Sequence, residues 1–293
     1  MVFKSDTVKQ WAMELGFSLV GITPSVPGDD VDRLLAYLEE GRHGQMAYME
    51  NYLAKRMDPR ELVENAKSVI CLAVNYYQSD PVDKPVHCGQ VARYAWGRDY
   101  HKILKKRLKQ LAMKISEKAE MKFRCFVDSG PILEKSFAAR AGLGWIGKNN
   151  LLINGKYGSW LVLGEIVTDL EFDVYDEPVN DGCCDCQKCI EACPSQALTP
   201  DRKLDARRCI SYWTVEANEE MPDDIKAVAG NRFFGCDICQ EVCPCNSAPV
   251  ICKDREIKIC HAYVDLDELA RLDNEQKKEK FAGSCLRRAL GKK

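Results

Sequence analysis

Two cysteine runs constrain the fold of this 293-residue chain more than any other feature. The first run has the spacing Cys183-x2-Cys186-x2-Cys189-x3-Cys193-Pro194. In bacterial ferredoxins this spacing lets three thiolates on one loop hold a 4Fe-4S cluster, whereas the fourth cysteine ligates a second cluster. The spacing therefore predicts a second cysteine run elsewhere in the chain.

That second run is present as Cys236-x2-Cys239-x3-Cys243-Pro244. By the same geometry we expect Cys243 to reach the first cluster. The second cluster then lacks one ligand, for which Cys209 is the best candidate and Cys245 and Cys252 are alternatives. The predicted ligand sets are Cys183, Cys186, Cys189 and Cys243 for the first cluster, and Cys193, Cys209, Cys236 and Cys239 for the second.

Disulfides and zinc explain the cysteines less well. Ten of the sixteen cysteines fall between residues 183 and 245, and no signal peptide is recognisable, so metal ligation is favoured over disulfides. Zinc would use four thiolates per ion, but the crossover before proline has no role in a zinc ribbon. We expect Cys184 to point away from the first cluster. The scattered cysteines are expected to be buried free thiols: Cys71, Cys88, Cys125, Cys260 and Cys285.

The composition is that of a globular protein, with 42 basic and 44 acidic residues and a formal net charge of -2. This balance gives no overall sign of a nucleic-acid or membrane partner, and no apolar stretch approaches the ~18 residues of a membrane span. We therefore expect a soluble, cytoplasmic monomer. The lysines between 102 and 109 form one local basic face, which either contacts phosphate or is a solvated helix surface. His101 is expected to lie on the same face, away from the apolar side of its helix.

Helix and strand patterns predict an α+β fold in three parts. Residues 1–175 are expected to form a catalytic domain with a mixed sheet, a long helix at 99–118 and a hairpin at 149–170. Residues 176–255 are expected to form the two-cluster, ferredoxin-like module. Residues 256–293 are charged and are expected to form a helical tail.

The segment from residue 126 to 153 contains the main candidates for catalytic side chains. Asp128 follows a strand and precedes a helix, where a carboxylate serves either as an N-cap or as a catalytic acid. Glu134 and Lys135 fit a solvated helix face. The glycine-rich stretch AGLGWIGK lacks the Walker spacing, and its glycines follow a helix where a dinucleotide motif would follow a strand. We interpret this stretch as close backbone packing against a cofactor or the cluster module.

These motifs together resemble one known family. The set VDSGPILEK, AGLGWIGKN, GSWLVLGEI, RCISYWTVE and GCDICQEVCPCN, together with the first cysteine run, is similar to that of the epoxyqueuosine reductases, over residues 1 to about 285. Those proteins are cobalamin-dependent iron-sulfur enzymes of tRNA modification. The resemblance implies a nitroreductase-like corrinoid-binding domain, two 4Fe-4S clusters, and a cobalamin that takes no histidine ligand from the protein.

The resemblance also implies roles for individual residues. The proton donor of the family falls on Asp128. For Arg56 a surface salt bridge, and for Ser211 a local turn hydrogen bond, are the alternatives without the resemblance. The implied corrinoid contacts are Arg56, Asp128, Leu152, Leu163, Ser211, Asp237 and Ile238.

The implied reaction is reduction of epoxyqueuosine to queuosine in tRNA with a queuosine-family anticodon, using an unidentified low-potential electron donor. An aspartic acid that donates a proton needs a raised pKa, which we expect from burial of Asp128. The chain is expected to be a short form without the HEAT-like C-terminal extension, and Cys245 replaces an expected tryptophan. Two alternatives stay open: a corrinoid iron-sulfur reductase or activator with another substrate, and a noncatalytic ferredoxin-type electron carrier.

Overall fold

A four-stranded antiparallel sheet lies at the centre of the computed structural model, which describes residues 2–83 and 86–287. The strand order is β2-β3-β8-β5. β3 is buried along its whole length, because both of its faces carry apolar side chains and both of its edges are paired. The strands are β2 (Leu19–Pro24), β3 (Ser68–Asn75), β5 (Phe123–Phe126) and β8 (Leu161–Thr168).

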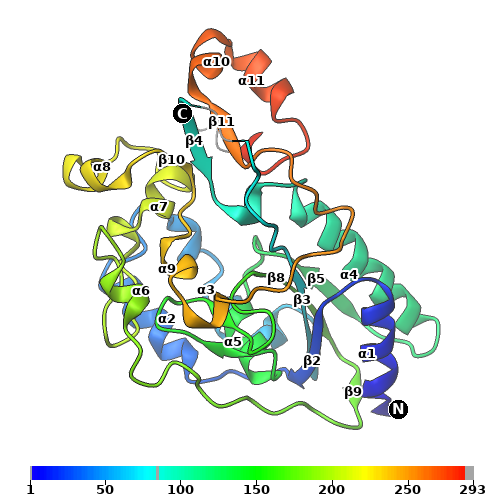
Figure 1. Ribbon diagram of the computed structural model, residues 1–293. Helices are drawn as coiled ribbons and strands as arrows, with labels where there is room; N and C mark the ends of the chain where they lie inside the picture. Colours follow the sequence, from blue (N-terminus) through cyan, green and yellow to red (C-terminus); the bar gives the residue numbers. More distant parts are fainter. Residues whose placement is uncertain (1, 84–85, 288–293) are drawn as a thin grey trace.

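Alternating residues of the sheet supply two separate cores. Ile70 and Leu72 pack with α1 (Ser5–Glu14) and α4 (Tyr100–Ser116), whereas Val69 and Cys71 pack with α5 (Glu134–Arg140) on the opposite face. Figure 1 shows α1 and α4 side by side along the sheet. Each fully buried aliphatic side chain contributes roughly 1.5–3 kcal/mol of hydrophobic free energy, so both faces of the sheet stabilise the fold.

The predicted α+β class is confirmed, and the mixed strand arrangement occurs in a second sheet. There β4 (Cys88–Val91) pairs in parallel with β10 (Arg232–Phe234) and antiparallel with β11 (Tyr263–Asp265). The tail is therefore only partly helical: it adds β11 to this sheet before α10 (Leu266–Arg271) and α11 (Asn274–Lys280). Figure 1 shows β4, β11 and both helices together at one end of the molecule.

The hairpin predicted at 149–170 is wrong in its pairing. β7 (Leu152–Ile153) pairs with β6 (Trp145–Ile146), while β8 pairs with β3 and β5. A single bridge between Asn154 and Gly158 is the part of the turn that forms. The long apolar β8 gains more by entering the central sheet than by pairing with a two-residue strand.

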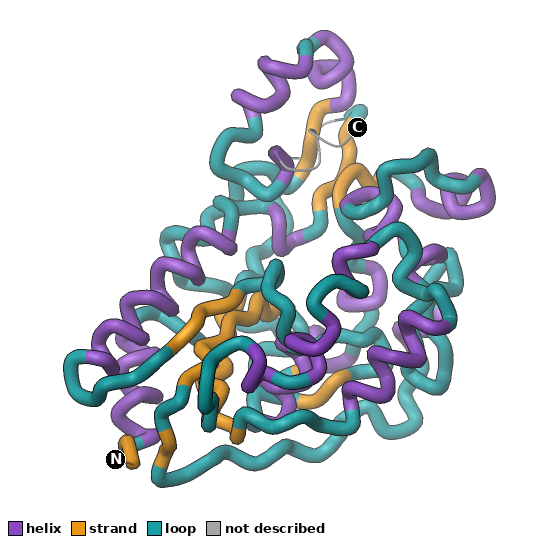
Figure 2. Tube along the Cα trace, turned by 180° about the vertical axis from the view of Figure 1, so that it is seen from behind, coloured by secondary structure: helices purple, strands orange, loops and turns teal. Residues whose placement is uncertain are grey.

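The cysteine-rich region consists of short helices and loops, as Figure 2 shows from behind. The helices within the two cysteine runs, α6 (Lys188–Glu191) and α9 (Ile238–Glu241), pack against each other. Among the described residues, no helix is long and apolar enough to span a membrane. The remaining elements are β1 (Val2–Phe3), α2 (Asp30–Glu39), η1 (Ala47–Met49), α3 (Leu53–Met57), η2 (Pro59–Glu61), η3 (Arg93–Ala95), β9 (Glu171–Phe172), α6 (Lys188–Glu191), η4 (Ala206–Arg208), α7 (Ile210–Val215), α8 (Asp223–Ala229), α9 (Ile238–Glu241) and η5 (Pro244–Asn246).

Candidate functional site

The structure brings the eight predicted cluster ligands together as two groups of four. The first group surrounds a small cavity of about 60 Å³, which Cys245 also lines. Cys184 does not line this cavity: its φ is +43°, its side chain is exposed, and its carbonyl accepts a hydrogen bond from Lys148 Nζ at 2.8 Å. The members of the first group are Cys183, Cys186, Cys189 and Cys243.

The second group lies in the wall of a much larger cavity. Cys209, at the start of α7, completes this group. The two alternatives lie elsewhere: Cys245 is at the first group, and Cys252 packs against the main core while its N–H donates to the carbonyl of Tyr77 at 2.8 Å. The members of the second group are Cys193, Cys209, Cys236 and Cys239.

The spacing of the sulfur atoms tests what each group fits. Four thiolates around one zinc ion, at about 2.3 Å from the metal, would have sulfur atoms about 3.8 Å apart. Within the part of the chain that the structure describes, no three of these cysteines have Sγ atoms within 4.8 Å of one another. Both groups are therefore too open for a single zinc ion and fit a larger iron-sulfur cluster.

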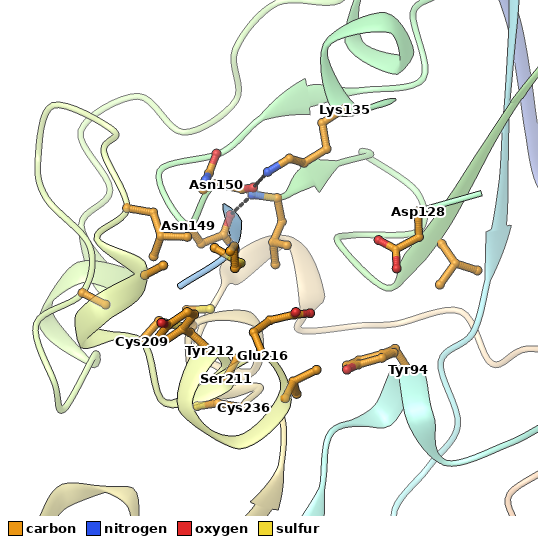
Figure 3. Close-up of a pocket in the computed structure, with 18 of the residues that line it drawn as sticks. Tyr94, Asp128, Lys135, Asn149, Asn150, Cys209, Ser211, Tyr212, Glu216 and Cys236 are labelled. Atoms are coloured by element: carbon orange, nitrogen blue, oxygen red, sulfur yellow. Dashed lines mark hydrogen bonds between the residues drawn. The ribbon is translucent and has the colours of Figure 1, made fainter. Parts of the chain in front are cut away.

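The large cavity has a volume of about 1120 Å³ and lies between the central sheet and the cysteine-rich region. Figure 3 shows Asp128 and Tyr94 on one side of it, and Cys209, Ser211 and Cys236 on another. This volume exceeds the ~300–1,000 Å³ of ordinary small-molecule sites, so a group of corrinoid size fits. The buried Nδ2 of Asn149, which lines both cavities, has no hydrogen-bond partner among the described residues and can serve a bound acceptor.

Five of the seven predicted corrinoid contacts line the large cavity: Arg56, Asp128, Ser211, Asp237 and Ile238. Arg56 forms no salt bridge with any residue that the structure describes. Its guanidinium donates to the carbonyls of Tyr48 (3.0 Å), Asn51 (3.3 Å) and Gly130 (3.5 Å). It therefore ties the segment before α3 to the loop that carries Asp128.

The structure does not bring Leu152 and Leu163 to the cavity. Both side chains pack in the core beneath α5, and their adjacent residues Leu151 and Val162 line the cavity instead. In strands, adjacent side chains point to opposite faces, so a one-residue error in position moves a predicted contact from the cavity to the core.

Asp128 lies at the cavity wall but is not buried as expected. Its side chain is 63% exposed. It is not a helix N-cap either, because α5 begins at Glu134 and its N-cap is Leu133. The residue has φ +57°, an uncommon conformation for a side-chain-bearing residue, and its N–H donates to Glu134 Oε1 at 2.5 Å.

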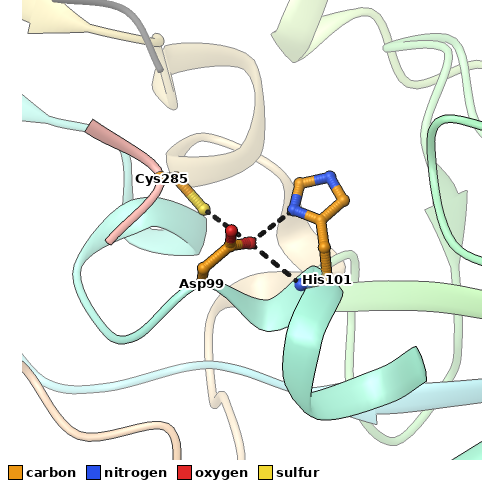
Figure 4. A group of neighbouring side chains, drawn as sticks. All are labelled: Asp99, His101 and Cys285. Carbon is orange, nitrogen blue, oxygen red and sulfur yellow. Dashed lines mark hydrogen bonds and ion pairs between the residues drawn. The ribbon is translucent and has the colours of Figure 1, made fainter. Parts of the chain in front are cut away.

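His101 is a site residue that sequence reasoning placed on a solvated face. Its Nδ1 lies 2.6 Å from Asp99 Oδ1 and its Nε2 lies 2.9 Å from Asp128 Oδ2. Figure 4 shows Asp99 contacting both His101 and the thiol of Cys285. Since both ring nitrogens are hydrogen-bonded to carboxylates, His101 is not free to ligate a metal in the cavity. The sequence feature that could have identified His101 is Asp-x-His at the start of a helix, where the aspartate caps the helix and orients the histidine.

Two further expectations change. Lys135 is not solvated: its ammonium donates to the carbonyl of Asn150 at 2.6 Å, and burial lowers its pKa to about 8. Cys260 is exposed rather than buried.

The glycine-rich stretch packs closely against the cysteine-rich region, as expected. A Cβ on Gly142 would lie 2.8 Å from the carbonyl oxygen of Glu177, and the carbonyl of Ile146 accepts a hydrogen bond from Arg202 at 2.9 Å.

A buried polar network fixes the cysteine-rich region to the central sheet. Asn246 Oδ1 accepts the N–H of Ser159, and Asn246 Nδ2 donates to Ser159 Oγ and to the carbonyl of Gln240, each at 2.8 Å. Gln240 Oε1 also accepts from Ser159 Oγ at 3.0 Å and from Tyr76 at 3.3 Å. This network holds the wall that contains Cys239 in place over the sheet.

Comparisons with known proteins agree with this arrangement. The family model "Epoxyqueuosine reductase QueG, DUF1730" matches residues 56–129, and the "4Fe-4S double cluster binding domain" matches residues 182–246. The epoxyqueuosine reductase of Cyclobacterium marinum is 41% identical over 287 residues, which cover 97% of this chain and 92% of that protein.

Solved structures give the same result. An epoxyqueuosine reductase crystallised with an epoxyqueuosine-modified stem loop of tRNA-Tyr has a TM-score of 0.90 and 30% identity, covering 97% of this chain and 79% of that one. The Bacillus subtilis enzyme, solved with the loop of its catalytic aspartate swung out of the active site, has a TM-score of 0.88, 30% identity and the same coverage. A reductive dehalogenase shares the fold at 16% identity and a TM-score of 0.52, over 84% of this chain and 32% of its own.

Proposed function

Since the chain belongs to the epoxyqueuosine reductase family, we propose that it does what its relatives are named for: it reduces epoxyqueuosine to queuosine in tRNA. The observation that carries this proposal is a single cavity of about 1120 Å³ with Asp128 on one side and the second cysteine group on another. An electron source and a proton source thus face the same space, which an electron carrier without a reaction of its own does not need.

The cysteines are the electron-transfer part of this assignment. The first group would hold one 4Fe-4S cluster and the second group the other, with Cys209 as the fourth ligand of the second. The large cavity would hold a cobalamin, in contact with Arg56, Ser211 and the Asp237–Ile238 segment. When bound, the clusters supply single electrons and the cobalamin supplies a two-electron reductant.

Asp128 is the proton donor of the reaction. Conversion of an epoxide to an alkene takes two electrons and two protons, and the oxygen leaves as water. Because Asp128 is exposed to the cavity, burial does not keep it protonated, and its carboxylate accepts a hydrogen bond from the imidazolium of His101. His101, held between Asp99 and Asp128, is therefore the proton store: as the oxygen departs, the imidazolium passes a proton to Asp128, and Asp128 passes it to that oxygen.

The substrate and the electron donor are inferred from the family. The substrate is tRNA with a queuosine-family anticodon, and a low-potential donor outside this chain supplies the electrons. We propose that the protein works in the cytoplasm as a monomer. We propose that the Asp128 loop is the counterpart of the catalytic loop that is swung out in the Bacillus subtilis relative, so that its position decides whether the proton donor faces the substrate.

The deciding experiment is a turnover assay under anaerobic conditions. The purified protein is incubated with epoxyqueuosine-containing tRNA, cobalamin and a low-potential reductant, and the nucleosides are analysed by mass spectrometry. Conversion to queuosine supports the assignment. Cobalt uptake without conversion would point to a corrinoid reductase or activator with another substrate, and iron without cobalt uptake would point to an electron carrier.

A further inference from the structure

An ionisable side chain lies in the middle of the apolar core beneath α5. Glu165 belongs to β8, where it is paired with Cys71 of β3 and with Phe126 of β5. Its exposed fraction is 0%, and as an anion it has no hydrogen-bond donor for either carboxylate oxygen among the described residues. A bare carboxylate in such surroundings is strongly disfavoured, so Glu165 is held in its neutral, protonated form.

A protonated Glu165 carries an O–H that needs an acceptor. Helix α5 packs on β8 and begins at Glu134, whose carboxyl group interacts with that of Glu165, so we take the Glu134 carboxylate as this acceptor. Burial raises the pKa of Glu165 well above its ordinary value, and the neighbouring charge of Glu134 raises it further. For Glu134, burial and then the charge of Asp128 raise the pKa to about 7.

Glu134 makes a second contact, to the loop of the proton donor. Its Oε1 accepts the backbone N–H of Asp128 at 2.5 Å. Asp128 has φ +57°, a left-handed conformation that is disfavoured for a residue with a side chain. Such a conformation persists only where neighbouring groups fix it. A continuous chain of contacts thus runs from the central sheet through Glu165 and Glu134 to the backbone of Asp128.

We propose that Glu165 and Glu134 are positioning residues, which hold the backbone of Asp128 in its left-handed conformation and so keep its carboxyl group at the cavity. This role rests on the proposed function, because it matters for turnover only if Asp128 is the proton donor. Without the Glu165 O–H, the carboxylate of Glu134 loses its partner in the core. It then turns toward water, since Glu134 is only partly buried, and releases the amide of Asp128.

Three variants test this chain of contacts. Glu165→Leu removes the O–H and leaves an apolar side chain among apolar neighbours. Glu165→Gln keeps a donor, its amide N–H, in the same place. Glu134→Ala removes the acceptor at the first residue of α5. The readout is hydrogen exchange of the backbone amides in residues 127–130 of the cluster-loaded protein, measured by mass spectrometry without substrate.

We expect exchange at this loop to be at least tenfold faster in Glu165→Leu and in Glu134→Ala, and to stay within twofold of wild type in Glu165→Gln. The double variant Glu165→Leu with Glu134→Ala should be no faster than either single one, because both substitutions act on one contact chain. In turnover, Glu165→Leu should lower kcat about tenfold and leave KM for tRNA unchanged.

A purely structural role for Glu165 predicts the opposite. Replacing a buried acid by leucine in an apolar core is often neutral or stabilising, and the loop would then exchange as in wild type. Wild-type exchange in Glu165→Leu would overturn the proposal. If that variant does not fold, wild-type exchange in Glu134→Ala overturns it equally. Faster loop exchange in a protein whose wild type does not reduce epoxyqueuosine would refute the proposed function and leave the positioning role standing.

Discussion

The imidazole of His101 links the carboxylate of Asp128, at 2.9 Å, to that of Asp99, at 2.6 Å. Because carboxylates only accept hydrogen bonds, both contacts are hydrogen bonds only when both ring nitrogens carry a proton. Burial alone would lower the pKa of His101, but the hydrogen bonds to Asp128 and then Asp99 outweigh it and raise the pKa to about 11. The histidine is therefore an imidazolium at neutral pH.

This raised pKa predicts how stability depends on pH. A raised pKa adds stability that is complete below the pKa of an unfolded histidine, about 6.5, and that is lost as pH rises toward the folded value. The melting temperature of His101→Gln should therefore fall furthest below wild type near pH 6, and the difference should shrink steadily up to pH 9.5. Thermal melts across this range measure it, with the exposed His87→Gln as control. A difference that is constant with pH would contradict the prediction.

Asp128→Asn should abolish most turnover while leaving the cofactors in place. Asparagine tolerates the left-handed φ of +57° and keeps the backbone N–H, but its amide is no acid. We expect kcat to fall about 10²–10⁴-fold, the range of a lost general acid. Iron and cobalt analyses of the same preparation check the cofactors, and the exposed Asp32→Asn on α2 is the matched control. Activity within threefold of wild type would rule out Asp128 as the proton donor.

The cysteine groups and the central elements could be predicted from the sequence, because the information is local. Ligand spacing within one loop fixed the group around Cys183, and the helix after Asp99 was evident from its apolar repeat. His101 was misplaced because helical periodicity cannot show that the first turn of α4 lies against a loop 27 residues further along. Glu165 gave no signal, because its role depends on contact with Glu134 on another element.

Single cysteine substitutions should separate ligands from bystanders. With two 4Fe-4S clusters the protein should contain about eight iron atoms. Cys209→Ser should lower the iron content toward half, because it removes a ligand of the second group, whereas Cys252→Ser should not. For the first group, Cys189→Ser should likewise lower the iron content, because it removes a ligand, whereas Cys184→Ser should not. Iron and sulfide analysis measures the result; full loss of iron in Cys184→Ser would show that the bystander assignment is wrong.

Asn246→Ala should loosen the cysteine-rich region from the sheet. The substitution leaves the N–H of Ser159 and the carbonyl of Gln240 buried without their partners, and each lost partner costs about 1–3 kcal/mol. We expect the melting temperature of the cluster-loaded protein to fall by about 5 °C or more. The exposed Asn274→Ala in α11 serves as the comparison, and an equal melting temperature in both would show that the network contributes little.

The proposed function also gives the exposed lysines of α4 a testable role, which is binding of the tRNA backbone. Lys102, Lys105, Lys106 and Lys109 are exposed, and His101 at the start of the same helix lines the cavity. A stem loop that places its modified base in the cavity therefore brings its phosphates within reach of this helix. Each lysine that contacts a phosphate of single-stranded or duplex nucleic acid adds close to one unit to the slope of log affinity against log salt.

The double variant Lys105→Ala with Lys106→Ala should accordingly raise KM for tRNA and reduce that salt slope by about one to two, with kcat unchanged. The exposed pair Lys118→Ala with Lys253→Ala, which carries the same loss of charge elsewhere, should leave the slope as in wild type. Steady-state kinetics at three salt concentrations distinguish the two. If both double variants show the wild-type slope, the lysines of α4 are a solvated helix face, and the tRNA backbone is bound by another surface.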